Sequence, residues 1–170
     1  MVNTNTYPIY FAKRHDQAIV PSKKLEDAGF DIYACFDEEC MVIQPHETKM
    51  IPSGLSTAFS SDLVMKLCER GSTGTKGIGQ RCGVIDSGYR GEIFVPITNH
   101  NEKPLIITKE ASESTLDALK DDYIVYPYSK AICQALMEYV PPCETMLIPL
   151  DELLTMKSER GEGCLGSSGK

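Results

Sequence analysis

The sequence predicts an all-β domain of the sandwich or barrel class. Short apolar or alternating runs recur along the chain, and Gly, Pro or Asx residues bound each of them. This spacing is typical of antiparallel β structure rather than of βαβ units, in which strands alternate with helical patterns. The length of 170 residues fits one domain with one packed core.

We expect strands at nine of these runs, which in chain order cover residues 7–11, 29–34, 41–45, 48–59, 63–70, 91–99, 103–108, 123–127 and 145–150. Prolines fall within or beside several runs. Because proline has no N–H donor for a neighbouring strand, it suits edge strands and bulges. These prolines are Pro45, Pro52, Pro96 and Pro149.

Two segments have helical character. In "ASESTLDALKDD", Ser112 or Ser114 is a suitable N-cap, and Leu116 and Leu119 have the spacing of one helical face. The segment "KAICQALMEYV" at 130–140 is rich in Ala, Leu, Met and Gln. Side-chain propensity alone slightly favours a helix there, although the flanking "YPYS" and "PP" fit the ends of a strand.

Composition and charge exclude several function classes. The formal net charge of −7 and the scattered Lys and Arg residues argue against direct binding to nucleic acid or to an anionic membrane surface. No apolar run reaches the roughly 20 residues of a membrane helix, and the N-terminus lacks the pattern of a signal peptide. We therefore expect a cytoplasmic protein.

The cysteines and histidines predict neither a disulfide framework nor a protein-held transition metal. The seven cysteines are odd in number and include no Cys-x-x-Cys pair. The histidines His15, His46 and His100 lie far apart in sequence. Any metal is expected to be a hard cation that arrives with a phosphate ligand.

Two internal segments carry residues suited to catalysis or phosphate binding. "GVIDSGYRGE" at 83–92 places Asp86 before Ser-Gly, where a turn residue is at first the simpler interpretation than a catalytic base. "ERGSTGTKGIG" at 69–79 combines Arg70, Ser72 and several glycines, the donors that a phosphate cradle needs. It is not a Walker loop, because no Gly-Lys-Ser/Thr ends it.

The C-terminal segment "SERGEGCLGSSGK" is rich in glycine and serine, and it is expected to be flexible. The alternative interpretation is an anion-binding arm, because glycine lets backbone N–H groups converge on phosphate oxygens while Arg160 adds a fork of donors.

Taken in order, five segments resemble the motifs of the trimeric deoxyuridine triphosphatases (dUTPases): "AGFDIYA", "RGST", "GVIDSGYRGE", "ICQ" and "RGEGCLGSSG". The resemblance implies a β-clip or distorted jelly-roll subunit of a homotrimer, with a short helical insert at about 101–128. It also implies a strand, not a helix, at "KAICQALMEYV". The implied reaction is Mg²⁺-dependent hydrolysis of dUTP to dUMP and pyrophosphate, which limits uracil incorporation into DNA and supplies dUMP for thymidylate synthesis.

The resemblance also implies roles for single residues. Asp86 matches the general base that activates water for attack at the α-phosphorus. Asp31 and Gln134 match positions that hold waters on a magnesium ion bound by the triphosphate. Tyr89 matches the ring that packs against deoxyribose, where a 2′-hydroxyl would clash.

The remaining implied roles concern the base and the phosphates. The hairpin that reads uracil matches Gln80, Cys82, Gly83 and Val84. The phosphate-contacting loop matches Arg70, Gly71 and Ser72, and the closing arm matches Arg160, Leu165, Gly166, Ser167 and Ser168. Two of these depart from the usual pattern: Gly71 stands where a serine is common, and Leu165 replaces the aromatic ring that stacks on uracil, which predicts looser binding.

The implied organisation is one domain over residues 1–158 and an arm over 159–170 that closes over an active site, contributed in trans. The partners expected are dUTP and two further copies of the chain, and the insert at 101–128 offers a site for a further protein partner. No nucleic-acid or membrane partner is expected.

Two alternative functions remain open from sequence. The dCTP deaminases share the implied fold but need a glutamate where this chain has Pro96, and proline cannot carry a proton. A nucleotide-binding regulator with weak or no turnover is the second alternative. The altered second and fifth motifs favour it, and the intact Asp86 argues against it.

Overall fold

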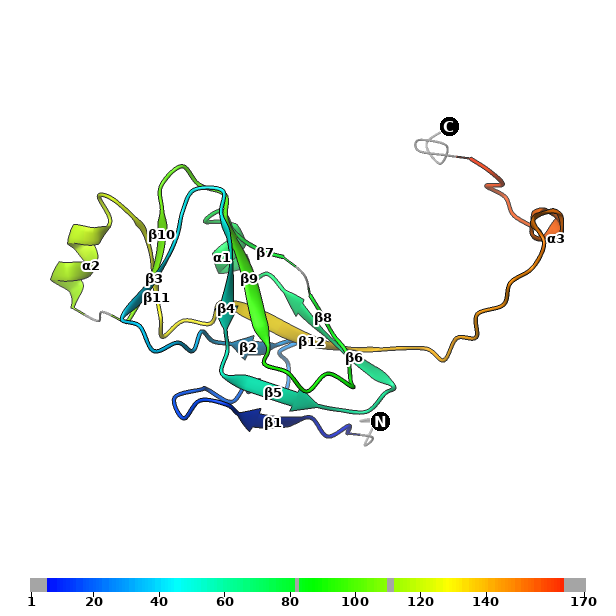
Figure 1. Ribbon diagram of the computed structural model, residues 1–170, viewed down its shortest axis with the longest axis horizontal. Helices are drawn as coiled ribbons and strands as arrows, with labels where there is room; N and C mark the ends of the chain where they lie inside the picture. The colour runs from blue at the N-terminus through cyan, green and yellow to red at the C-terminus, as the bar shows by residue number, and fades with distance from the viewer. Residues whose placement is uncertain (1–5, 82, 110–111, 164–170) are drawn as a thin grey trace. The chain divides into compact units, whose positions relative to one another are not determined.

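The computed structural model describes residues 6–81, 83–109 and 112–163. The chain divides into two units, residues 1–140 and 141–170. Most of the regular secondary structure of the first unit is β-strand (Figure 1), which confirms the predicted all-β class. Within the described ranges, no helix is long and apolar enough to cross a membrane.

The described strands of the first unit form four small sheets. Two of them have the orders β1-β5 and β11-β10-β3, and the others have the orders β2-β12-β6-β8 and β4-β9-β7. All pairings are antiparallel except that of β10 with β11. The strands are β1 (Tyr10–Lys13), β2 (Phe30–Ile32), β3 (Cys40–Ile43), β4 (Thr48–Pro52), β5 (Leu55–Ala58), β6 (Leu63–Cys68), β7 (Ile78–Gln80), β8 (Val84–Ile85), β9 (Phe94–Asn99), β10 (Leu105–Thr108), β11 (Ile124–Pro127) and β12 (Cys133–Tyr139).

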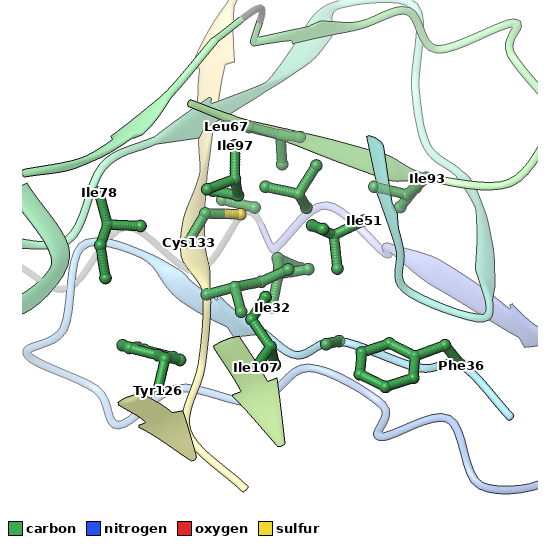
Figure 2. Close-up of a cluster of buried hydrophobic side chains, with 14 of the residues drawn as sticks. Ile32, Phe36, Ile51, Leu67, Ile78, Ile93, Ile97, Ile107, Tyr126 and Cys133 are labelled. Carbon is green, nitrogen blue, oxygen red and sulfur yellow. The ribbon is translucent and has the colours of Figure 1, made fainter. Parts of the chain in front are cut away.

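A main hydrophobic core joins the three larger sheets, and a smaller cluster of Ala18, Cys35 and Leu55 lies at β5. Side chains from different sheets converge in Figure 2, among them Ile32, Ile51, Leu67 and Ile107. The alternation along β6 shows how the sequence directs this, because Leu63, Met65 and Leu67 are buried while the residues between them are more exposed. Burial of each such side chain is worth about 1.5–3 kcal/mol.

The two segments with helical character have different outcomes. Helix α2 (Glu113–Leu119) lies in the expected segment and begins after Ser112, which confirms the prediction. The segment at 130–140 forms β12, so the propensity-based preference for a helix there was wrong. Its backbone pairs with both β2 and β6, and two ladders of hydrogen bonds together with burial override a small difference in propensity.

The expected strand at 145–150 was also wrong. Residues 141–149 have no strand, and Leu150 begins helix α3 (Leu150–Thr155) of the second unit. A strand needs a neighbouring backbone, and the described part of the second unit offers none to this segment. A further short helix, α1 (Gly71–Gly74), forms in the Gly-rich loop, where no helix was expected.

Candidate functional site

An apolar cleft of about 250 Å³ opens beside β8. Its wall combines the "GVIDSGYRGE" segment with side chains from β4, β6 and β9. The lining residues are Met50, Leu67, Gly83, Val84, Ile85, Asp86, Tyr89, Glu92, Phe94 and Pro96. An apolar cleft with a few polar groups at its rim suits a flat, largely apolar ligand such as a nucleobase.

Asp86 lies where β8 ends and a turn begins. Its backbone carbonyl accepts a hydrogen bond of 3.0 Å from the N–H of Tyr89. Its side chain is exposed, and within the described ranges no group donates a hydrogen bond to the carboxylate. Side-chain turn chemistry therefore does not occupy this carboxylate, which is available to a water molecule or a ligand.

Tyr89 forms another part of the wall. The residue is 43% exposed, and its hydroxyl donates a hydrogen bond of 2.9 Å to the carbonyl of Glu92. The ring is therefore fixed at its hydroxyl end where it lines the cleft.

The chain from β7 to β8, two strands of different sheets, contributes backbone as well as side chains. The N–H of Leu67 donates to the carbonyl of Gly83 at 2.7 Å, and the N–H of Arg81 donates to the carbonyl of Pro96 at 2.9 Å. Val84 is 67% exposed at the cleft. Gln80 lines neither this cleft nor the polar cleft, since its side-chain amide donates to the carbonyl of Arg81 at 2.7 Å.

A separate, polar cleft of about 410 Å³ lies at β2, β12 and α1. It brings together residues from three of the sequence motifs. The lining residues are Ser22, Asp27, Ala28, Gly29, Asp31, Arg70, Gly71, Ser72 and Gln134. The hydroxyl, guanidinium, amide and carboxylate groups among them suit a phosphate chain and its counter-ion.

Strand pairing places Asp31 and Gln134 in this cleft. They lie opposite each other in the antiparallel register of β2 and β12. Gln134 donates from Nε2 to the carbonyl of Glu69 at 3.0 Å. Gly29 makes room for this amide, because a Cβ at residue 29 would lie 3.2 Å from Gln134 Oε1.

Arg70 is held in place at the mouth of the polar cleft. Its Nε lies 3.2 Å from Asp31 Oδ1, and its Nη1 donates to the carbonyl of Ala131 at 3.0 Å. The hydroxyl of Tyr126 donates to the same Ala131 carbonyl, and burial raises the pKa of that phenol. An arginine fixed in this way keeps other N–H donors for an anion.

The structure adds residues that the sequence analysis missed. Met50, Phe94 and Glu92 line the apolar cleft, and Ser22 and Asp27 line the polar one. Met50 lies opposite Pro96 in the β4 and β9 ladder, so only the long-range pairing of these strands brings it to the cleft.

The expected arm residues are only partly described. In the second unit, Arg160 donates from Nε to the carbonyl of Gly163 at 2.9 Å. Cys82 of the hairpin and the arm residues Leu165, Gly166, Ser167 and Ser168 lie outside the described residues.

The part of the chain that the structure describes contains no cluster of three or more His, Cys, Asp or Glu side chains able to hold a metal ion. The thiol of Cys133, which lies next to Gln134, is buried, and burial raises its pKa to about 12. It is therefore protonated at neutral pH and unsuited to metal binding or nucleophilic attack.

Comparison with known proteins gives a consistent result. A family model described as dUTPase matches residues 15–112. The chain is 31% identical over 156 residues to the deoxyuridine 5'-triphosphate nucleotidohydrolase of Neisseria meningitidis serogroup B, and the match covers 89% of this chain and 88% of that protein.

Solved structures share the fold. The dUTPase of Staphylococcus bacteriophage 80alpha, solved with dUPNHPP, has a TM-score of 0.73 at 21% identity, over 97% of this chain and 100% of that chain. A mutant dUTPase from phage phi11 of S. aureus, whose structure shows the coordination of a structural Mg(II) ion, has a TM-score of 0.64 at 18% identity. That match covers 83% of this chain and 96% of the phage protein.

Proposed function

The chain belongs to the dUTPase family, and on that premise we propose that Asp86 is the general base of its reaction. As a dUTP diphosphatase, the protein hydrolyses dUTP to dUMP and pyrophosphate. The observation that carries the proposal is the carboxylate of Asp86, exposed at the rim of the apolar cleft. An ionised carboxylate in this position orients a water molecule and accepts its proton as the water attacks the α-phosphorus.

The apolar cleft suits uracil and deoxyribose. The backbone at Gly83 and Val84 borders the cleft, where main-chain donors and acceptors hydrogen-bond to the edge of the base. Tyr89 presents its ring to the sugar, and a 2′-hydroxyl on that side of the sugar meets the ring. Substrate choice then depends on close packing as well as on hydrogen bonds.

The polar cleft suits the phosphate chain. Arg70 and Ser72 supply donors, and their contacts with phosphate oxygens neutralise charge that develops during the reaction. Arg160 and residues 165–168 close over the β- and γ-phosphates in this proposal, and closure strengthens the charge contacts by excluding water.

The residues of the polar cleft fit a magnesium ion that is bound mainly by the triphosphate. Asp31 and Gln134 supply oxygen atoms of the kind Mg²⁺ prefers, and two such groups suit a cation that keeps much of its water shell. When bound, magnesium neutralises charge on the phosphates. Asp31 and Gln134 orient its waters, and the ion pair with Arg70 fixes the carboxylate of Asp31.

The two clefts lie near opposite edges of one sheet. Asp31 is on β2 and Asp86 directly follows β8, which are the two edge strands of the sheet β2-β12-β6-β8. Three strand spacings separate these edges by about 14 Å. Because the base has to reach a phosphate held in the polar cleft, we infer a homotrimer in which Asp86 and Tyr89 of one chain face the polar cleft of another.

The first experiment tests Asp86. The variant Asp86→Asn keeps the size and polarity of the side chain but removes the base. It is expected to lose nearly all pyrophosphate release while its affinity for dUTP remains close to that of the wild type. Normal turnover by this variant would remove Asp86 from the proposed role.

The second experiment tests the shared site. Asp86→Asn and Arg70→Ala are co-expressed in equal amounts with different tags, and trimers carrying both tags are purified. If each site combines two chains, about one third of the sites in trimers that carry both tags contain both intact halves, and a matching share of activity returns. If each site lies within one chain, mixing restores nothing.

Two further features stay predictions. The insert at 101–128 contains α2, which has no buried residue and is therefore exposed to a possible protein partner. Action in the cytoplasm also stays a prediction.

A further inference from the structure

The backbone that follows Tyr89 is tied to the β1-β5 sheet. Ser56 on β5 donates from its hydroxyl to the carbonyl of Gly91 at 2.9 Å and lies 3.1 Å from the carbonyl of Arg90. Arg14, directly after β1, donates from Nη2 to the same Arg90 carbonyl at 2.9 Å. Neither Arg14 nor Ser56 lines the apolar cleft.

Arg14 also orients the hydroxyl of Ser56. Its Nε donates to Ser56 Oγ at 2.6 Å, so this oxygen accepts from the guanidinium while its own hydrogen points to the loop carbonyls. Consecutive hydrogen bonds of this kind polarise and strengthen one another.

A second anchor lies on the other side of the loop. Glu92 Oε1 accepts a hydrogen bond of 2.8 Å from the N–H of Gly54. Gly54 has φ +68°, and a Cβ there would lie 2.8 Å from Cys35 Sγ. Only glycine suits this tightly packed position, so the amide that holds Glu92 has a fixed place.

The anchored backbone in turn places the ring of Tyr89. The Tyr89 hydroxyl donates to the carbonyl of Glu92 at 2.9 Å. The ring also lies so close over Gly91 that a Cβ at residue 91 would collide with the phenol oxygen. A shift of residues 91–92 must therefore move the ring.

We propose that Ser56 and Glu92 are positioning residues, assisted by Arg14, which fix Tyr89 and thereby set the preference for deoxyribose over ribose. The inference rests on the proposed contact between Tyr89 and the sugar. The anchors act through the ring, because Ser56 lies outside the cleft and the carboxylate of Glu92 is bound to Gly54.

Ser56→Ala tests the first anchor, with the ratio of kcat/KM for dUTP to that for UTP as the readout. Loss of one hydrogen bond is expected to lower this ratio roughly threefold to tenfold, because a looser ring admits the 2′-hydroxyl and lowers KM for UTP, while kcat for dUTP stays nearly unchanged. Ser56→Thr, which keeps the hydroxyl, is expected to restore the ratio.

Thr57→Val is the matched control on the same strand. Thr57 is buried and donates from its hydroxyl to the carbonyl of Tyr10 at 3.0 Å, so the variant also loses one hydrogen bond but has no contact with the loop. Its thermal stability is expected to fall while its dUTP to UTP ratio stays at the wild-type value. An equal loss of discrimination in both variants would overturn the proposal.

Glu92→Ala and Glu92→Gln test the second anchor. The glutamine amide oxygen still accepts from Gly54, so the ratio is expected to fall in Glu92→Ala and to remain near the wild-type value in Glu92→Gln. Equal behaviour of the two variants contradicts the second anchor.

Tyr89→Ala separates failure of this inference from failure of the proposed sugar contact. If Tyr89→Ala leaves the ratio unchanged, both the sugar contact and this inference are wrong. If Tyr89→Ala lowers the ratio but Ser56→Ala does not, only the positioning role is wrong. Support requires that Ser56→Ala lower the ratio in the wild type and cause no further loss in the Tyr89→Ala background.

Discussion

Gly83→Ala is predicted to damage both the stability and the substrate affinity of the enzyme. Gly83 precedes β8 and borders the apolar cleft. A Cβ added at this position would lie 2.6 Å from the backbone carbonyl oxygen of Leu67. The obstacle is backbone within a hydrogen-bonded sheet, so a rotation of one side chain cannot relieve the collision.

The magnitude follows from the distances. An ordinary carbon to oxygen contact is about 3.3 Å or longer, so the two backbones have to separate by about 0.7 Å. The bond from the N–H of Leu67 to the carbonyl of Gly83, now 2.7 Å, would then lengthen to about 3.4 Å and be largely lost. That loss costs about 1 kcal/mol and the overpacking about 1–3 kcal/mol, which together give about 2–4 kcal/mol.

Chemical denaturation and steady-state kinetics measure the two effects. The free energy of unfolding is expected to fall by the amount above. The KM for dUTP is expected to rise more than kcat falls, because the collision displaces the part of the cleft wall formed by Leu67 and Gly83 rather than the carboxylate of Asp86.

Gly88→Ala serves as the control within the same segment. A Cβ at Gly88 meets no atom within 4 Å, and its φ is not positive. The substitution is therefore expected to stabilise the protein by about 0.4–1 kcal/mol, because it restricts the unfolded chain. If Gly83→Ala were as stable as Gly88→Ala, with an unchanged KM, the reasoning from close backbone approach would be refuted.

Three further predictions concern pH, the arm and the core. Burial raises the pKa of Cys133 to about 12 from its ordinary value of 9.0, so as the pH rises the thiol loses its proton in the unfolded chain before it does in the folded one. The free energy of unfolding, measured across pH, should therefore fall from about pH 9 upward, and it should fall less steeply in Cys133→Val. Truncation after Ser158 should abolish turnover, and full turnover by the truncated chain would contradict a role for the arm. The melting temperature should stay nearly unchanged, since the core clusters lie before residue 141. Asn99 is fully buried and donates to the carbonyls of Ile43 and Lys103. Asn99→Leu removes this donor and should lower the free energy of unfolding by about 2–4 kcal/mol in denaturant titrations; a loss below about 0.5 kcal/mol would contradict this.

Local sequence signals predicted most of the strands. Alternation in "LVMKLCER" and the punctuation around "GEIFVPITN" correspond to β6 and β9. The signal failed where pairing rather than composition decides the structure. The segment at 130–140 has helical residues but lies between two strands, and the apolar run at 145–150 has no strand beside it and ends at α3.

Part of the candidate site could be expected from the sequence, as was the case for the strands. Asp31, Arg70 and Gln134 were identified as one phosphate and magnesium group from motif order, and the structure brings them into one cleft. Met50 and Phe94 were missed, because a methionine or phenylalanine in a strand has no local signal that separates a cleft wall from a core position.

The all-β class, the family and the chemical groups available for catalysis depend on residue type and order along the chain, so they could be predicted before the fold was known. The placement of Asp86 at one edge of a sheet and of Asp31 at the other is visible only in the folded chain. It also revealed that Ser56, 35 residues before Gly91, holds the loop after Tyr89. Hydrogen bonds between distant strands fix such neighbours, and no local pattern of residues encodes them.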